Sequence, residues 1–226
     1  MGHMNRLLVL AAVAVCLWSA PTVADKINEK PSKIEPILKG IEDRYAGKGF
    51  SASFFQESIL KAMQITDTAE GHLTVKRPGK MRWEYTIPDP QTIITDGKSM
   101  WIYRPADNQV IVGKAPAYFS DGKGAGFLSD IHQIRKSFTI ESQPAENDAY
   151  FRLKLLPLKP TAELADVIIS VSKKTFQIDQ VITHNDYGDE TRFVLSDYKF
   201  NIDPEESLFT FSIPKGMDVV KMDQVK

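Results

Sequence analysis

The sequence predicts a mainly β fold of the α+β class, in which one N-terminal helix precedes a series of antiparallel strands. Runs rich in β-branched and aromatic residues recur about every ten residues from Phe50 onward, a spacing typical of a sandwich or barrel. Short turn signals such as Pro78-Gly79 and Asp96-Gly97 separate these runs, so consecutive strands are expected to pair antiparallel. A stripe of apolar residues at helical spacing before Phe50 predicts the helix.

Residues 1–24 are predicted to be an expression scar followed by a signal peptide. Met1–Met4 resembles such a scar, and Leu7–Trp18 is an unbroken apolar run. This run is too short for a membrane-spanning helix, which needs about 20 residues. The small residues at Thr22–Ala24 are typical of a signal-peptide cleavage site. We therefore expect one exported domain over residues 25–226.

Charge and cysteine content restrict the function classes. The net charge is −1, and it becomes −2 when Arg6 leaves with the leader, so no bias favours nucleic acid or an anionic membrane. Cys16 is the only cysteine and also lies in the leader, which excludes disulfides from the remaining chain. A lipid anchor on Cys16 is disfavoured because Val15 is not the small residue expected before one.

The helix is predicted over Lys33–Tyr45, because its apolar residues fall on one face. These residues are Ile34, Ile37, Leu38, Ile41 and Tyr45. Ser32 and Glu35 resemble a capping box that would begin the helix. Pro36 belongs in a first turn, which makes Glu35 an alternative cap.

Strands are expected wherever apolar alternation or a short apolar run lies between turn signals. The expected ranges are 50–61, 66–76, 80–87, 91–95, 99–104, 108–112, 136–142, 149–156, 165–172, 176–185, 190–199 and 208–212. The connections between them are mostly short, which predicts a mainly antiparallel meander.

Several of the expected strands are apolar at consecutive positions. Ile93-Ile94, Met100–Tyr103 and Val110–Val112 break the alternation that Leu73 and Val75 show. An antiparallel sheet with one solvated face alternates cleanly. This sheet is therefore expected to be covered on both faces or to bind an apolar ligand.

The segment 113–133 is too long for a hairpin turn and carries its own apolar residues. Among them are Tyr118, Phe119, Phe127, Leu128 and Ile131. One interpretation is a short helix over Phe127–Ile134 that forms a lid on one face of the sheet. The other is a surface crossover whose aromatic side chains simply fill the core.

No enzyme motif stands out. The chain has no GxSxG, HExxH or CxxC motif and no glycine-rich phosphate loop. Ser58 and Lys61 match SxxK, but they lie in an expected strand, where positions i and i+3 point to opposite faces. His72, His132 and His184 are isolated in the sequence. We expect no catalytic residue, no metal and no cofactor.

Aromatic residues gather on the central strands, at Trp83, Tyr85, Trp101 and Tyr103. Such residues are typical of a hydrophobic core, although they also occur in carbohydrate sites. Their neighbours include Met81, Met100 and Ile93, rather than the amides and carboxylates of a sugar site. If this region binds a ligand, an apolar ligand is favoured.

Arg77 ends an apolar strand and directly precedes Pro78, which places it at the rim of the sheet. Its guanidinium carries five donors in a fixed fork and can tie a neighbouring loop through backbone carbonyls. The alternative is a solvated arginine in a turn.

Four segments carry a family resemblance. They are FSASFFQ at Phe50–Gln56, KRPGKMRWEY at Lys76–Tyr85, TDGKSMWIY at Thr95–Tyr103 and FTFSIPKGMDVV at Phe209–Val220. Together they are similar to the LolA family of periplasmic lipoprotein carriers. The resemblance implies an unclosed antiparallel β-barrel, or strongly curved half-barrel, with an N-terminal helix and a short helical lid over an apolar cavity.

The resemblance also implies a function and partners. Such a carrier is a monomer in the periplasm, binds the acyl chains of lipoproteins and catalyses no reaction. It receives lipoproteins from an ABC-type release complex of the inner membrane and passes them to an outer-membrane lipoprotein receptor. No nucleic acid is involved. The alternatives are a carrier or sensor of another lipid on the same fold, and an interaction protein that binds no ligand.

The resemblance also implies roles for individual residues, according to their positions in the sequence. The resemblance implies that Arg77 is a latch that binds the backbone of the lid. The acyl cavity or its rim is expected at Leu73, Met81, Trp83, Ile93, Trp101 and Tyr103. The lid is expected at Phe127, Leu128 and Ile131.

Overall fold

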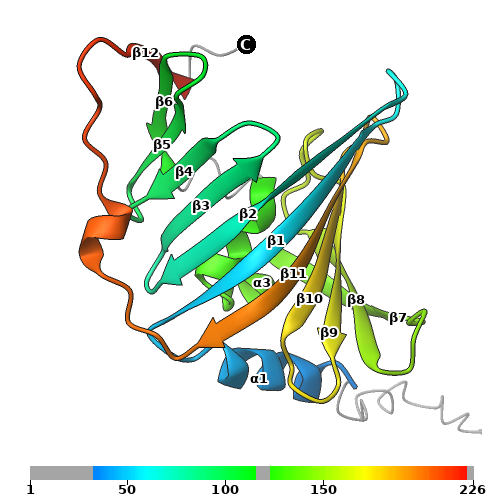
Figure 1. Ribbon diagram of the computed structural model, residues 1–226. Coiled ribbons are helices and arrows are strands. Elements are labelled where there is room, and N and C mark those ends of the chain that lie inside the picture. The colour runs from blue at the N-terminus through cyan, green and yellow to red at the C-terminus, as the bar shows by residue number, and fades with distance from the viewer. Residues whose placement is uncertain (1–32, 116–122, 223–226) are drawn as a thin grey trace, which may run out of the picture. The chain divides into compact units, whose positions relative to one another are not determined.

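A computed structural model describes residues 33–115 and 123–222 (Figure 1). The predicted leader over 1–24 lies outside the described residues, as do Ser32, Tyr118 and Phe119. Among the described helices, none is long and apolar enough to cross a membrane.

The described residues form one sheet of twelve strands. The strands are β1 (Gly49–Leu60), β2 (Ile65–Lys76), β3 (Lys80–Ile87), β4 (Gln91–Thr95), β5 (Ser99–Arg104), β6 (Gln109–Lys114), β7 (Phe138–Gln143), β8 (Tyr150–Pro157), β9 (Asp166–Ser172), β10 (Ile178–His184), β11 (Glu190–Phe200) and β12 (Asp218–Lys221). Eleven of the predicted strands are confirmed, with ends shifted by two residues at most. Their order in the sheet is β12-β6-β5-β4-β3-β2-β1-β11-β10-β9-β8-β7.

The sheet is an open half-barrel, as the family resemblance implies. Two antiparallel meanders, β1–β6 and β7–β11, join where β1 pairs with β11. The outermost strands, β12 and β7, stand at opposite ends of the order, so the sheet does not close on itself. In Figure 1 the sheet curves strongly, with α1 (Glu35–Arg44) across its lower end and α3 (Gln133–Ser137) inside the curve. We call the inner side the concave face.

The predicted strand 208–212 is wrong. A short 3-10 helix, η2 (Glu206–Phe209), and an extended segment occupy this range, and β12 forms later and pairs parallel with β6. Phe209 is fully buried, and the ring of Phe211 packs on Tyr103. The apolar residues of this range therefore cover part of the outer face of the sheet instead of joining its ladder.

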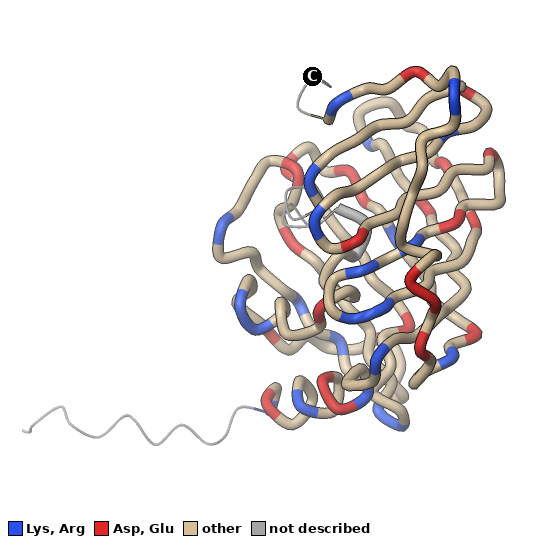
Figure 2. Tube along the Cα trace, turned by 90° about the vertical axis from the view of Figure 1, so that its left-hand side faces the viewer, with Lys and Arg blue, Asp and Glu red and all other residues tan. Residues whose placement is uncertain are grey.

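Residues 203–217, which we call the C-terminal strap, cover the part of the outer face formed by β2 to β5. Lys76 bridges its start, with Nζ 2.9 Å from Asp203 and 3.2 Å from Glu206. Lys48 also binds Asp203, at 2.7 Å, and these two lysines hold the pKa of Asp203 at about 2 by hydrogen bonds to its carboxylate. Figure 2 shows charges of both signs interspersed along the chain.

The helix α1 begins at Glu35, slightly later than predicted. Its N-cap is Ile34, which makes no side-chain cap, and Pro36 falls in the first turn. The prediction of Glu35 as a cap is wrong, because the side chain of Glu35 instead accepts hydrogen bonds from Arg135. Ile37, Leu38 and Ile41 are buried, which confirms the apolar stripe.

Candidate functional site

One wall of the concave face comes from β2 to β5. Leu73 pairs with Trp83, Trp83 with Ile93, and Ile93 with Ile102, which aligns these side chains on one face of the sheet. All four are buried. The Trp83 ring lies 5.0 Å from that of Phe54, between ring centroids. This wall offers only apolar contacts along that row.

A second wall faces it from β8 to β11. Its buried residues include Leu153, Leu155, Ile169, Val181, Phe193 and Leu195. Phe193 lies 5.3 Å from Trp83, between ring centroids, so the two walls meet across β1. Both walls belong to one continuous hydrophobic cluster, which also includes α1.

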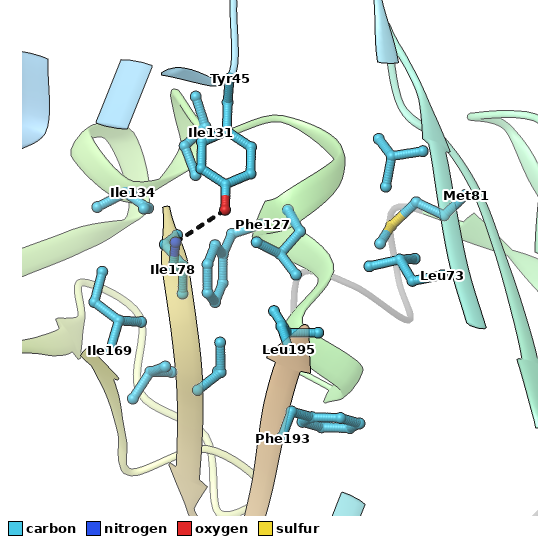
Figure 3. Packing of buried hydrophobic residues seen from close by; sticks show 14 of the residues in the cluster. Tyr45, Leu73, Met81, Phe127, Ile131, Ile134, Ile169, Ile178, Phe193 and Leu195 are labelled. Atoms are coloured by element: carbon cyan, nitrogen blue, oxygen red, sulfur yellow. Dashed lines mark hydrogen bonds between the residues drawn. The ribbon is translucent and has the colours of Figure 1, made fainter. Parts of the chain in front are cut away.

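A short segment between β6 and β7 fills the space inside the curve. It contains a 3-10 helix, η1 (Lys123–Ser129), and then α3. Its side chains at Phe127, Leu128, Ile131 and Ile134 are between 0% and 6% exposed. Figure 3 shows Phe127, Ile131 and Ile134 pointing inward, with Leu73 and Met81 across from them. We call η1, α3 and the residues between them the lid.

The lid is not the single helix predicted over Phe127–Ile134. Asp130 interrupts it: Oδ1 accepts a hydrogen bond from the backbone N–H of His132 at 3.1 Å, and Oδ2 accepts one from Gln133 Nε2 at 2.8 Å. Such local bonds favour a turn and a new helix start. Ile134 ends the predicted helix but was not among the side chains expected to form the lid, although its spacing from Ile131 could have indicated it.

Arg77 ties a loop through a backbone carbonyl. Its Nη1 donates to Gly47 O at 3.0 Å, and its backbone N–H donates to Lys48 O at 2.8 Å. The segment it binds follows α1, so this hydrogen bond does not reach the lid. Its Nη2 is buried and makes no hydrogen bond to the described residues. Burial lowers the pKa of Arg77, and the negative charge of Asp130 in the lid opposes that effect.

Comparison with known proteins identifies the family. Residues 46–212 match the family model described as outer membrane lipoprotein carrier protein LolA. The chain belongs to the LolA family. An outer-membrane lipoprotein carrier protein from Chromobacterium violaceum is 30% identical over 96% of this chain and 97% of its own length. One from Hahella chejuensis is 27% identical over 96% of this chain and 98% of its own length.

A solved structure shows the same fold. The crystal structure of an uncharacterized conserved protein from Thermus thermophilus matches with a TM-score of 0.54 at 12% identity, covering 83% of this chain and 98% of that protein.

Two cavity residues expected from the LolA resemblance lie elsewhere. Trp101 and Tyr103 are on the outer face, because each neighbours Ile102, which points to the concave face. Their ring centroids lie 6.4 Å and 5.4 Å from that of Phe211 in the strap. Trp101 and Tyr103 are aromatic because the strap packs on them, so their assignment to the cavity is wrong.

The LolA-family site also depends on a residue that was predicted only as part of the helix. Tyr45 Oη accepts a hydrogen bond from the backbone N–H of Ile178 at 3.0 Å and donates to Tyr198 Oη at 3.2 Å. Tyr198 Oη in turn donates to Ile178 O at 2.6 Å. Burial raises the pKa of Tyr45 to about 12. This ring of three hydrogen bonds fixes the end of α1 to β10.

Tyr45→Phe is expected to lower the free energy of unfolding by about 1–3 kcal/mol, because the buried N–H of Ile178 loses its acceptor. Urea unfolding monitored by circular dichroism measures this loss. Tyr103→Phe, on the outer face, is the matched control and should change stability by less than about 0.5 kcal/mol. Equal effects of the two changes would contradict the structural role of the ring.

Proposed function

We propose that this chain carries lipoproteins across the periplasm by binding their acyl chains on its concave face. The observation that supports this most is the filling of an apolar concave face by four side chains of a short lid rather than by the sheet itself. Acyl chains offer the same kind of surface as these side chains. A cargo could therefore replace the lid residues without exposing the walls to water.

The energetics favour such an exchange. Burial of each methylene group contributes about 0.8 kcal/mol, so one long acyl chain offers on the order of 10 kcal/mol. Displacing Phe127, Leu128, Ile131 and Ile134 from the concave face opposes part of this gain. Net affinity then falls to a level that allows release. Apolar contacts are non-directional, so the walls should discriminate little between acyl chain lengths.

The family's role also suggests the partners. The cargo would come from an ABC-type lipoprotein release complex in the inner membrane and pass to an outer-membrane lipoprotein receptor. The carrier itself would act as a monomer, without cofactor or catalysis. Membership of a lipoprotein carrier family supports this sequence of steps.

Depletion in cells combined with cargo capture tests the proposal. When the protein is depleted, lipoproteins destined for the outer membrane should accumulate in the inner membrane. The tagged protein, isolated from the periplasm, should carry intact acylated lipoproteins that mass spectrometry detects. Normal lipoprotein sorting after depletion, together with no acylated cargo, would contradict the proposed function.

Arg77→Leu is expected to accept lipoprotein but to pass it on poorly. Without the Arg77 guanidinium, the loop after α1 loses its bond to Gly47 O, and Asp130 in the lid loses a nearby positive charge. The closed state therefore weakens, and returning lid residues expel the cargo less well. Transfer from loaded carrier to outer-membrane vesicles containing the receptor measures this. Arg104→Leu, whose Nε binds Gln91 at the end of another strand, is the matched control. Equal transfer by Arg77→Leu and wild type would reject a role of Arg77 in closing the lid.

A second candidate is an interaction protein that binds no ligand, and the complete burial of the lid side chains favours it. In that case the lid residues are a permanent part of the hydrophobic core. The protein would then bind no acyl probe at any ionic strength.

A further inference from the structure

Arg135 in α3 connects the lid to α1. Arg135 Nη1 and Nη2 donate to the two carboxylate oxygens of Glu35 at 2.8 and 2.9 Å. Arg135 Nε donates to Glu42 Oε1 at 2.5 Å, and Nη2 reaches Glu42 Oε2 at 3.3 Å. His132 Nδ1 also lies 3.5 Å from Glu42 Oε1. One guanidinium thus connects the lid to both ends of α1.

This arrangement differs from an ordinary surface ion pair, which contributes little to stability. Arginine meets both carboxylates in the forked geometry that makes such contacts strong. The Arg135 side chain is 32% exposed, that of Glu42 21% and that of Glu35 61%. Solvent therefore screens the contact with Glu42 only in part and the contact with Glu35 more strongly. Hydrogen bonds to Glu35 and Glu42 raise the pKa of Arg135, and the bond to Arg135 lowers that of Glu35.

The helix α1, to which Arg135 binds, is itself held in place. The end of α1 is joined to β10 by the Tyr45 hydrogen bonds, and Arg77 holds the segment that follows α1. The residue before Arg135 is Ile134, which is buried on the concave face. Any movement that removes Ile134 from that face must therefore also move Arg135 relative to Glu35 and Glu42.

We propose that Arg135 is a positioning residue that sets how often the lid is closed, and that salt therefore controls acyl affinity. This inference deepens the proposed function and rests on it. If chains bind only when the lid has left the concave face, the apparent affinity equals the intrinsic affinity multiplied by the open fraction. Weakening the contacts of Arg135 raises the open fraction and tightens binding.

The first test is titration with an uncharged fluorescent acyl probe at low and high salt. At about 20 mM NaCl, Arg135→Gln should bind the probe about threefold to tenfold more tightly than wild type. At about 500 mM NaCl this ratio should approach one, because salt screens the wild-type contact. High salt also strengthens apolar binding in general. The change in affinity of Arg135→Gln between the two salt concentrations measures this general effect.

Arg152→Gln is the matched control, because Arg152 pairs with Glu146 at 3.1 Å on the outer face, away from the lid. It should bind the probe as wild type does at both salt concentrations. A ratio between Arg135→Gln and wild type that stays at one, or that does not change with salt, would overturn the proposal.

The second test does not depend on acyl binding. In a protein carrying Cys16→Ser and Ile131→Cys, the new thiol lies in the lid at a buried position. Adding Arg135→Gln should increase its rate of labelling by a thiol reagent about threefold to tenfold, while adding Arg152→Gln should not. An unchanged rate would overturn the proposal. If no variant binds the acyl probe but labelling still accelerates, the proposed function fails and the lid contact stands.

Discussion

Leu128→Ala is expected to tighten the binding of an acyl probe by about thirtyfold or more. Leu128 is fully buried on the concave face, and truncating such a leucine removes about 2–5 kcal/mol from the state in which it is buried. Only the closed lid buries it, so the balance shifts toward the open lid. Each 1.4 kcal/mol of this shift is a factor of ten in apparent affinity.

Fluorescence titration with the probe, together with urea unfolding, measures both consequences of this change. The matched control is Ile94→Ala, which empties a buried site on the outer face of the sheet. Both variants should be less stable than wild type, but only Leu128→Ala should gain affinity. Weaker binding by Leu128→Ala would mean that this residue holds the cargo and does not compete with it.

Trp83→Ala should lower the free energy of unfolding by about 3–5 kcal/mol, the usual loss for a large buried aromatic side chain. Trp83 is 2% exposed and packs on Phe54 and Phe193, so its removal separates the two walls. Trp101→Ala on the outer face is the control and should be less destabilising, because Trp101 is only half-buried. Urea unfolding of the three proteins tests this, and equal losses would contradict the assignment of Trp83 to the wall.

Much of the sheet could be predicted from local patterns. Alternation and turn residues such as Pro78-Gly79 are short-range signals, and eleven of the twelve predicted strands form. The pairing of β1 with β11 joins segments far apart in the sequence, and no local pattern specifies it. The prediction of a strand over 208–212 is wrong because the apolar residues of this range cover a face of the sheet. Strand propensity cannot distinguish such residues from those of a hydrogen-bonded strand.

The site was harder to predict than the sheet. Consecutive apolar residues indicate that both faces of the sheet are covered. They do not indicate which face is covered by the lid and which by the strap. Trp101 was therefore placed on the wrong face. The partner of Arg77 depends on where the chain passes after α1, and the Tyr45 hydrogen bonds join α1 to Ile178 and Tyr198, which are far away in the sequence. Both features depend on the three-dimensional fold, so the spacing of residues in the sequence does not predict them.

The central claim is that cargo acyl chains occupy the concave face, and two tryptophans on opposite faces allow a direct test. Trp83 lies on the concave face and Trp101 on the outer face, and Trp18 can be replaced by phenylalanine in both proteins compared. The measurement is quenching of tryptophan fluorescence by a fatty-acyl probe that carries a short-range quencher on its chain. The account predicts strong quenching in the Trp101→Phe protein, where Trp83 remains, and little in the Trp83→Phe protein. Equal quenching in both proteins, or none in the Trp101→Phe protein, would contradict it.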